Sequence, residues 1–223
     1  IEFVKRFGWG DAERGRLAGD ASFRKYDRLR RAGKSVVLMD APPPQEDVRP
    51  FVRIAKHLHA LGFSVPEVLA TEDTRGFVLL EDLGDETSTR LLARGESEAK
   101  LYTLAVDALI ALHKVPLADV RPSGVIEYGT PRLLEEVERL IVWYLPLAGA
   151  PKPTSAAAAA YNDIWRALLP AAWRAPTSLV LFDYHVDNLL GLFDRPGIKA
   201  CGLLDFQDAV MGPVTYDLMS LLE

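Results

Sequence analysis

Three polar residues near the end of the sequence have the types and the spacing that phosphoryl transfer requires. Asp183 follows an apolar run, Asn188 comes five residues later, and Asp205 follows a second apolar run and precedes Phe206. In phosphoryl transfer a carboxylate accepts the proton of the attacking hydroxyl, while an Asn and a second Asp hold the divalent cation that bridges the phosphates. The spacing Asp-x-x-x-x-Asn with a later Asp-Phe pair is typical of that chemistry. Asp183 is therefore the candidate catalytic base, and Asn188 and Asp205 are candidate Mg²⁺ ligands.

A β-hairpin is predicted to bring these side chains together. Residues 189–193 and 198–204 are apolar runs, and the turn sequence at 194–197 separates them. Folding back would place Asn188 and Asp205 at the same end of the hairpin, with the first Asp in the loop just before it. The alternative is that all three are ordinary turn and cap residues, which Asp and Asn favour. Two carboxylates directed into one space would, however, repel each other without a cation.

The elements upstream predict a bilobal α+β fold resembling that of the protein kinases. We expect an N-terminal lobe at 1–82, an antiparallel sheet plus a helix, and a mainly helical C-terminal lobe at 83–223 that contains the catalytic hairpin. The expected strands are 12–17, 23–29, 35–39, 65–71 and 77–81, and the expected helices are 46–61, 97–115, 131–145 and 155–173. A further helix begins at Tyr216, and we expect the natural protein to continue beyond Glu223.

A nucleotide would bind between the two lobes. The small residues between the first two expected strands form a candidate phosphate cover, because they let backbone N–H groups approach phosphate oxygens; they are Gly19, Asp20, Ala21 and Ser22. The alternative is a plain hairpin turn. Backbone groups near Glu81 and Leu83 are candidates for pairing with an adenine edge, and the alternative is an ordinary connection between lobes.

Composition limits the other classes of function. The formal net charge is −5, which argues against a nucleic-acid partner, and no stretch approaches the roughly 18–20 apolar residues of a membrane span. The single cysteine, Cys201, lies in an apolar run and is expected to be a core thiol in a cytoplasmic protein. A zinc site is a weak alternative, because the sequence has no paired His or Cys ligands. Its residues would be Asp183, His185, Asp187 and Asp205.

Several motifs resemble the aminoglycoside phosphotransferase and choline kinase superfamily, which has the protein-kinase fold. Within it they look like the bacterial N-acetylmuramate/N-acetylglucosamine anomeric kinases of cell-wall recycling. The motifs are 19–26, 39–43, 80–85, 143–146, Asp183-Tyr184-His185-Val186-Asp187-Asn188, Asp205-Phe206-Gln207-Asp208-Ala209, and Gly212-Pro213 with Tyr216-Asp217-Leu218.

The resemblance implies a function and residue roles. The enzyme would transfer the terminal phosphoryl group of ATP, with Mg²⁺, to the anomeric hydroxyl of an N-acetylated amino sugar. The sugar 1-phosphate would then enter peptidoglycan recycling. Asp183 would be the base and Asn188 and Asp205 the magnesium ligands. Asp217 would brace the catalytic loop, the alternative being a helix cap. Candidate substrate contacts are His185, Asp187, Gln207, Asp208 and Tyr128.

The sequence also departs from the superfamily pattern. The third strand usually carries a Lys that binds nucleotide phosphates, and Met39 stands there instead. Either Arg24 or Lys25 supplies this charge from the neighbouring strand, or the chain lacks it. This departure keeps a nucleotide-binding pseudokinase open as an alternative. An aminoglycoside antibiotic kinase is another alternative, and it would need an acidic acceptor pocket. The acidic candidates are Asp208, Glu127, Glu135 and Glu136.

Overall fold

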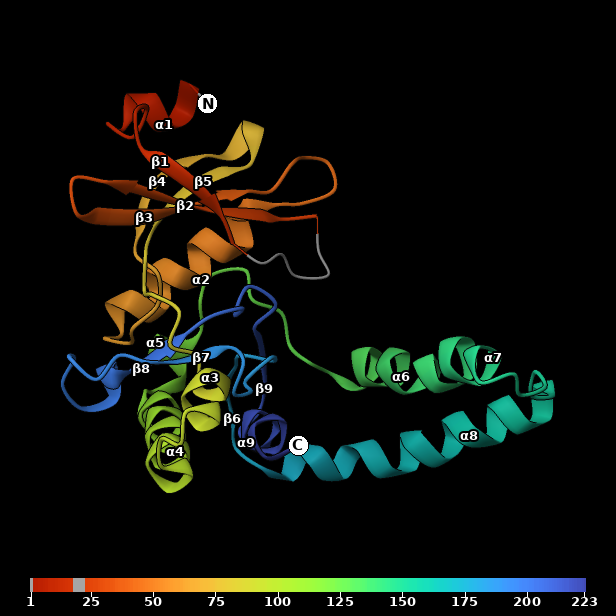
Figure 1. Ribbon diagram of the computed structural model, residues 1–223. Coiled ribbons are helices and arrows are strands. Elements are labelled where there is room, and N and C mark those ends of the chain that lie inside the picture. Colours follow the sequence, from red (N-terminus) through yellow and green to blue (C-terminus); the bar gives the residue numbers. More distant parts are fainter. Residues whose placement is uncertain (1, 18–22) are drawn as a thin grey trace.

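A five-stranded antiparallel sheet forms the first part of the structure, a computed structural model that describes residues 2–17 and 23–223 (Figure 1). Its strand order is β1-β2-β3-β5-β4. The strands are β1 (Glu13–Arg16), β2 (Lys25–Arg31), β3 (Lys34–Asp40), β4 (Val68–Glu72) and β5 (Phe77–Glu81). All five lie where the sequence predicted strands, with ends that shift by a few residues.

The sheet buries both of its faces, as the alternation of side chains along β3 and β5 shows. Leu38 and Leu79 pack on one face against the short helix α1 (Glu2–Arg6), in a cluster that includes Phe3. Met39 and Val78 point to the other face and belong to a larger cluster. Successive side chains of a strand point to opposite faces, so each strand supplies both clusters.

Helix α2 (Val48–Ala60) joins the sheet to the rest of the protein. Asp47 caps its N-terminus by accepting a hydrogen bond from the backbone N–H of Arg49. Phe51, Ile54, Ala55 and Leu58 recur at helical spacing and are buried. They belong to the cluster that continues from the sheet into the helical part below it (Figure 1).

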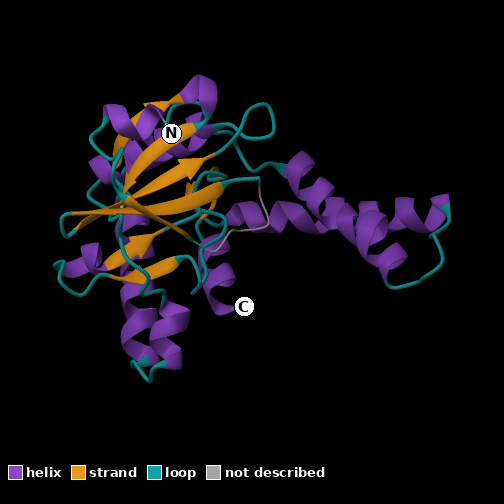
Figure 2. Ribbon diagram, turned by 45° about the horizontal axis from the view of Figure 1, so that its top comes forward, coloured by secondary structure: helices purple, strands orange, loops and turns teal. Residues whose placement is uncertain are grey.

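The chain after residue 82 is mainly helical (Figure 2). The helices are α3 (Ser88–Ala93), α4 (Glu98–Lys114), α5 (Leu117–Val120), α6 (Thr130–Arg139), α7 (Leu145–Leu147), α8 (Ser155–Leu168) and α9 (Thr215–Leu222). The predicted helix 131–145 is interrupted by a π-helical turn at Leu140–Tyr144. Helices α6 to α8 form an arm that projects from the body (Figures 1 and 2). No helix in the described ranges is long and apolar enough to cross a membrane.

Two small antiparallel ribbons lie within the helical part. Strand β6 (Thr177–Val180) pairs with β9 (Val210–Pro213), and β7 (Leu189–Gly191) pairs with β8 (Cys201–Leu203). The second pair is the predicted catalytic hairpin, with shorter strands than expected. Gly197–Ala200 forms a 3₁₀ turn before the returning strand begins.

Candidate functional site

The β7–β8 ribbon brings Asn188 and Asp205 to one end, as the sequence predicted. Leu189 pairs with Leu203 at the open end of the ribbon. One residue further out, the N–H of Leu204 donates to the carbonyl of Asn188 at 2.9 Å. Asp205 is the next residue, so the register itself sets the two candidate metal ligands side by side.

Asp183 lies in a loop that closes on Asn188. The Asn188 side-chain amide donates to the carbonyl of Asp183 at 3.0 Å, and its nitrogen lies 3.2 Å from Nε2 of His185. Tyr184 is 2% exposed, and its hydroxyl donates to the carbonyl of Ala105 in α4 at 2.8 Å. The loop is therefore fixed to the helical core on one side and to Asn188 on the other.

Asp217 on α9 braces the same loop from below. Its two carboxylate oxygens accept the backbone N–H groups of Leu181 at 2.8 Å and Phe182 at 3.0 Å. The side chain is 1% exposed, and this burial raises the pKa of Asp217 to about 6. Phe182 has a positive φ of 78°, a conformation that a non-glycine residue rarely adopts unless its surroundings impose it. The brace therefore fixes the backbone immediately before Asp183.

Two aromatic rings pack around Phe182, the residue before Asp183. Phe182 stacks on Tyr216 with ring centroids 5.2 Å apart, and Tyr128 meets Phe182 edge-on at 5.3 Å. Tyr128 is only 2% exposed. The ring of Tyr128 supports the loop through Phe182, and a substrate contact at Tyr128 stays a prediction.

Asp205 is held by its neighbours in an uncommon backbone conformation. Its φ is +56°, and Gln207 donates its side-chain amide to one carboxylate oxygen at 2.5 Å. The following residue, Phe206, is fully buried and stacks on Phe51 of α2, with ring centroids 5.1 Å apart. Packing of Phe206 therefore determines where Asp205 points.

A cavity of about 560 Å³ lies between the sheet and the ribbon and includes the candidate ligands. Its apolar walls come from the sheet on one side and from the ribbon on the other, and Asn188 and Asp205 lie on its border. The connection between the lobes forms its back. The cavity lining also includes Tyr26, Arg28, Glu81, Leu83, Asp187 and Gln207.

The comparisons with known proteins agree with this geometry. Residues 14–223 match the sequence family described as "Phosphotransferase enzyme family". The chain belongs to this family. It is 40% identical over 217 residues to the N-acetylmuramate/N-acetylglucosamine kinase of Pseudomonas aeruginosa, covering 96% of this chain and 61% of that protein. The kinase of the same name from Caulobacter vibrioides is 34% identical, covering 99% of this chain and 69% of that protein.

Solved structures of aminoglycoside phosphotransferases have the same kinase-like fold. The streptomycin–ATP complex of APH(2")-IIa gives a TM-score of 0.62 at 15% identity, covering 98% of this chain and 74% of that one. The GDP and kanamycin complex of a related enzyme gives a TM-score of 0.68 at 16% identity, covering 99% of this chain and 75% of that one. This phosphotransferase chain spans about three fifths of the length of the first two curated kinases it matches.

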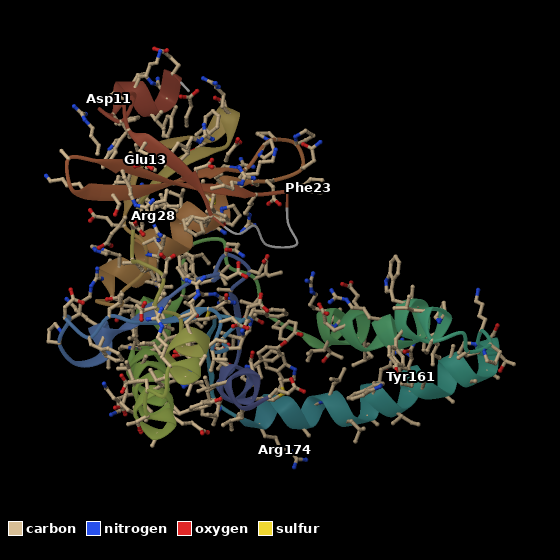
Figure 3. All side chains as sticks on the ribbon, viewed as in Figure 1. Asp11, Glu13, Phe23, Arg28, Tyr161 and Arg174 are labelled. Carbon is tan, nitrogen blue, oxygen red and sulfur yellow. The ribbon has the colours of Figure 1, made fainter. Side chains whose placement is uncertain are left out.

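Arg28 on β2 is a site residue that the sequence analysis missed. It is 6% exposed and donates to Asp82 at 2.8 Å and to Asp85 at 2.5 Å, both in the connection between the lobes. Figure 3 shows it beneath the sheet, toward the helical part. The hydrogen bond from Arg28 lowers the pKa of Asp85. The sequence indicated Arg28 only by placing a charged residue at a position that strand alternation predicts to be buried.

The structure distinguishes the two cations proposed to replace the missing Lys. Met39 is fully buried in the core. Lys25 is exposed, whereas Arg24 is largely buried and forms an ion pair of 2.9 Å with Glu46, just before α2. Strand alternation places Arg24 on the same face as Tyr26, which lines the cavity. The four residues of the expected phosphate cover, 19–22, lie outside the described residues.

The ligand set suits magnesium better than zinc. In the described part of the chain no group of three or more His, Cys, Asp or Glu side chains is placed to hold a metal, so the geometry there gives the zinc alternative no support. Mg²⁺ needs only one or two protein carboxylates beside substrate phosphates and water. Asp205 offers a carboxylate, and Asn188 offers its amide oxygen, because its amide nitrogen already donates to a carbonyl. These residues therefore fit a phosphate-bound Mg²⁺.

The remaining candidate contacts lie around the catalytic loop. The Thr89 hydroxyl donates to Asp187, which borders the cavity. His185 lies 3.8 Å from Asp187, while Gln207 and the exposed Asp208 follow Asp205. These positions keep all four as candidates for contact with the acceptor.

Two of the four acidic candidates for an antibiotic-binding pocket are paired with arginines. Glu127 pairs with Arg121 at 3.1 Å, and Glu136 pairs with two arginines of its own helix. Glu135 is exposed on α6. These ion pairs reduce the negative charge that Glu127 and Glu136 could offer to a polycation.

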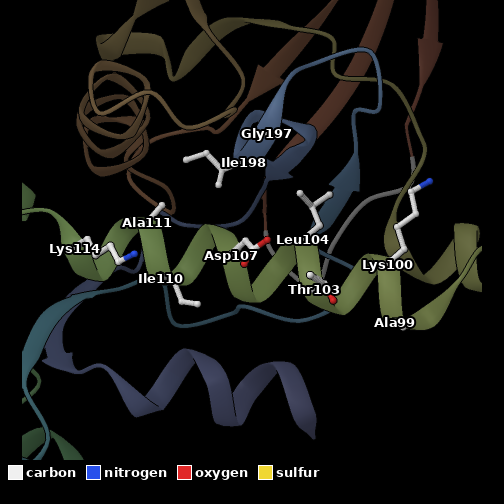
Figure 4. Close-up of a pocket in the computed structure, with 10 residues that line it drawn as sticks. All are labelled: Ala99, Lys100, Thr103, Leu104, Asp107, Ile110, Ala111, Lys114, Gly197 and Ile198. Atoms are coloured by element: carbon white, nitrogen blue, oxygen red, sulfur yellow. The ribbon is translucent and has the colours of Figure 1, made fainter.

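A shallow groove lies between α4 and the turn of the β7–β8 ribbon (Figure 4). It has a volume of about 740 Å³ and is bordered by Leu104, Ile110 and Ile198, with Lys100 and Lys114 toward its two ends. Asp107 is the one acidic residue that borders it. The groove lacks the convergent polar groups that a catalytic site requires.

Proposed function

We propose that this protein transfers the terminal phosphoryl group of ATP to the anomeric hydroxyl of N-acetylmuramate or N-acetylglucosamine. The product would be the sugar 1-phosphate, an intermediate of peptidoglycan recycling in the cytoplasm. The observation that carries the proposal is the convergence of Asp183, Asn188 and Asp205 at the open end of one ribbon. The curated kinases named above support the choice of acceptor.

In this proposal the side chains have separate roles. The Asp183 carboxylate accepts the proton of the C1 hydroxyl as its oxygen forms a bond to the terminal phosphorus. The bond between that phosphorus and the bridging oxygen breaks, and ADP leaves with the electron pair. Asn188 and Asp205 would hold Mg²⁺, which offsets the phosphate charge when it is bound.

The nucleotide would occupy the cavity between the lobes. We propose that the boundary between the lobes lies at residues 82 and 83, where backbone groups near Glu81 and Leu83 would contact the base. The polar end of the cavity, with Asn188 and Asp205, would receive the phosphates. Arg24 is our candidate for an additional phosphate contact, and residues 19–22 would cover the phosphates.

The test is to identify the phosphorylated product. Purified protein is incubated with Mg²⁺–ATP and N-acetylmuramate, N-acetylglucosamine or kanamycin, and ADP release is followed. Phosphorus NMR then distinguishes an anomeric phosphate from a 6-phosphate. We expect an anomeric phosphate from the N-acetylated sugars and negligible turnover with kanamycin. Turnover of kanamycin alone would favour the antibiotic kinase, and nucleotide binding without turnover of any acceptor would favour the pseudokinase.

A further inference from the structure

The turn end of the β7–β8 ribbon, opposite the catalytic end, reaches the sheet lobe through one side chain. Arg195 donates one guanidinium N–H to Glu81 at 2.6 Å and another to the hydroxyl of Ser64 at 3.0 Å. Glu81 is the last residue of β5, and Ser64 lies between α2 and β4. Arg195 therefore links the ribbon to two separate segments of the other lobe.

Ser64 is itself part of the ribbon's edge. Its backbone carbonyl accepts the N–H of Leu203 at 2.8 Å, and its hydroxyl donates to the carbonyl of Lys199 at 2.7 Å. The side chain is 3% exposed. The segment before β4 thus extends the ribbon, and Arg195 adds a hydrogen bond from the ribbon turn to the Ser64 side chain.

Glu81 receives Arg195 in a fixed position. The backbone N–H of Glu81 donates to the carbonyl of Glu67 at 2.9 Å, while the N–H of Glu67 donates to the Glu81 carboxylate at 3.3 Å. Glu81 also borders the nucleotide cavity and begins the connection between the lobes. Its backbone, the proposed contact for the base, is therefore held at the point where Arg195 binds its side chain.

Each end of the short ribbon thus carries side chains that act at a different end of the cavity. Asn188 and Asp205 stand at the open end, and Arg195 stands at the turn end. The strands between them have three residues each, a length of about 10 Å at the rise of a β-strand. A rigid element of this length can set the distance between the base contact and the metal ligands.

We propose that Arg195 is a positioning residue for the nucleotide. It fixes the distance between Glu81, at the end of the cavity that would bind the base, and the pair Asn188 and Asp205, at the end that would bind the phosphates. The inference rests on the proposed function, because it concerns how the same cavity binds a nucleotide. Without Arg195 the cavity keeps its phosphate contacts and its base contact but loses the fixed distance between them.

The solvent exposure of Arg195 and Glu81 distinguishes a role in nucleotide positioning from a purely structural role. The side chains of Arg195 and Glu81 are 29% and 32% exposed, and ion pairs this accessible to water add little to stability. Loss of Arg195 should therefore change the melting temperature little and the affinity for a whole nucleotide more. Adenosine and tripolyphosphate, which each contact one end, should bind as before.

The experiment compares Arg195→Met with Arg94→Met in the full chain. Arg94 forms a similar ion pair with Glu86 at 2.6 Å, but both partners belong to the same lobe. Calorimetric titration with Mg²⁺–ADP, adenosine and tripolyphosphate gives the three dissociation constants. We expect Arg195→Met to weaken Mg²⁺–ADP binding about five- to tenfold, the effect of losing one or two hydrogen bonds. Arg94→Met should bind like the unaltered protein.

Two further variants give a readout that a merely structural role would not produce. Arg195→Lys keeps a charge that can reach Glu81 and should restore most of the Mg²⁺–ADP affinity. Combining Arg195→Met with Glu81→Gln should weaken binding no more than Arg195→Met alone, because the first change already removes the contact with Glu81. A lowered melting temperature with unchanged Mg²⁺–ADP affinity in Arg195→Met would overturn the inference. Failure of the unaltered protein to bind any nucleotide would overturn the proposed function and the inference with it.

Discussion

Phe51 of α2 stacks on Phe206, in the loop after β8, with ring centroids 5.1 Å apart and an angle of 22° between the ring planes. Both rings are buried, and Phe206 directly follows Asp205. The stack connects α2 to the residue that would hold the metal. We therefore expect a displacement of α2 to move Asp205 through this aromatic contact.

Removing the Phe51 ring should affect both stability and catalysis. Phe51→Ala leaves a cavity beside Phe206, and we expect the free energy of unfolding to fall by about 3–5 kcal/mol. The Mg²⁺ concentration that gives half-maximal activity should also rise, because Asp205 loses its support. Urea unfolding and a magnesium titration measure the two effects. Phe51→Leu is the control, and it should show smaller changes of both kinds.

Asp217 should be essential to the rate although it does not touch the reactants. Asp217→Asn replaces one acceptor oxygen by an NH₂ group that opposes a backbone N–H of Leu181 or Phe182. We expect kcat to fall about ten- to a hundredfold, which corresponds to the loss of a hydrogen bond to a charged group. The KM for ATP should stay within about twofold, because the phosphate contacts remain. A variant with unchanged kcat would show that the brace is dispensable.

The buried carboxyl of Asp217 also predicts an acidic limit to activity. Its pKa is raised to about 6, whereas an Asp in an unfolded chain has a pKa of about 4. Between these values the folded protein keeps a proton that the unfolded chain has lost. This group therefore favours folding more as the pH falls from 6 to 4, and less as the pH rises.

Activity should follow the opposite trend, because a protonated Asp217 places an O–H donor against a backbone N–H. We expect kcat to fall below about pH 6. Below this pH the contribution of the Asp217 carboxyl to the free energy of unfolding should not decrease. A kcat profile measured from pH 5 to 8 beside urea unfolding checks both. In Asp217→Asn the fall of kcat at acidic pH should be less steep. If kcat falls with pH as in the unaltered protein, another group is responsible for the titration.

Asp183 should contribute to the chemical step and not to nucleotide affinity. Asp183→Asn removes the proton acceptor but keeps the size of the side chain. We expect turnover to fall by about 10²–10⁴, the usual contribution of a general base. The dissociation constant for Mg²⁺–ADP should change little. Turnover equal to that of the unaltered protein would remove Asp183 from its role.

Arg24 and Lys25 provide a matched pair of cations for testing the phosphate contact. Arg24 faces the cavity side and pairs with Glu46, while Lys25 is exposed on the other side of the strand. We expect Arg24→Met to raise the dissociation constant for ATP at least about tenfold, the loss of a charged hydrogen bond. Adenosine binding should not change, and Lys25→Met should bind ATP normally. If Lys25→Met weakens ATP binding and Arg24→Met does not, the phosphate contact belongs to Lys25.

Local sequence pattern predicted most of the fold because the pattern there is strong. Helix α2 shows its buried face at helical spacing, and β5 is a continuous apolar run between turn residues. The hairpin was predicted because its turn lies between two apolar strands. The register of β7 and β8 then follows from their shared turn, so the pairing of Asn188 with the neighbour of Asp205 could be foreseen.

Other parts of the site depend on contacts between distant residues. Strand β9 pairs with β6 some thirty residues earlier, and neither strand alone indicates its partner. Arg28 binds Asp82 and Asp85, which follow it by 54 and 57 residues, and no local period indicates that contact. Tyr128 looked like a polar side chain near the loop, but long-range packing against Phe182 buries it.

Cys201 gives this protein a practical property for spectroscopy. It is the single cysteine of the sequence, it is 3% exposed, and burial raises the pKa of its thiol to about 12. A thiol without access to water and without thiolate character does not react with maleimides. Cysteines introduced by Lys34→Cys on the sheet and Leu147→Cys on the arm would therefore accept fluorophores selectively. Energy transfer between these labels would report how the distance between sheet and arm responds to each ligand.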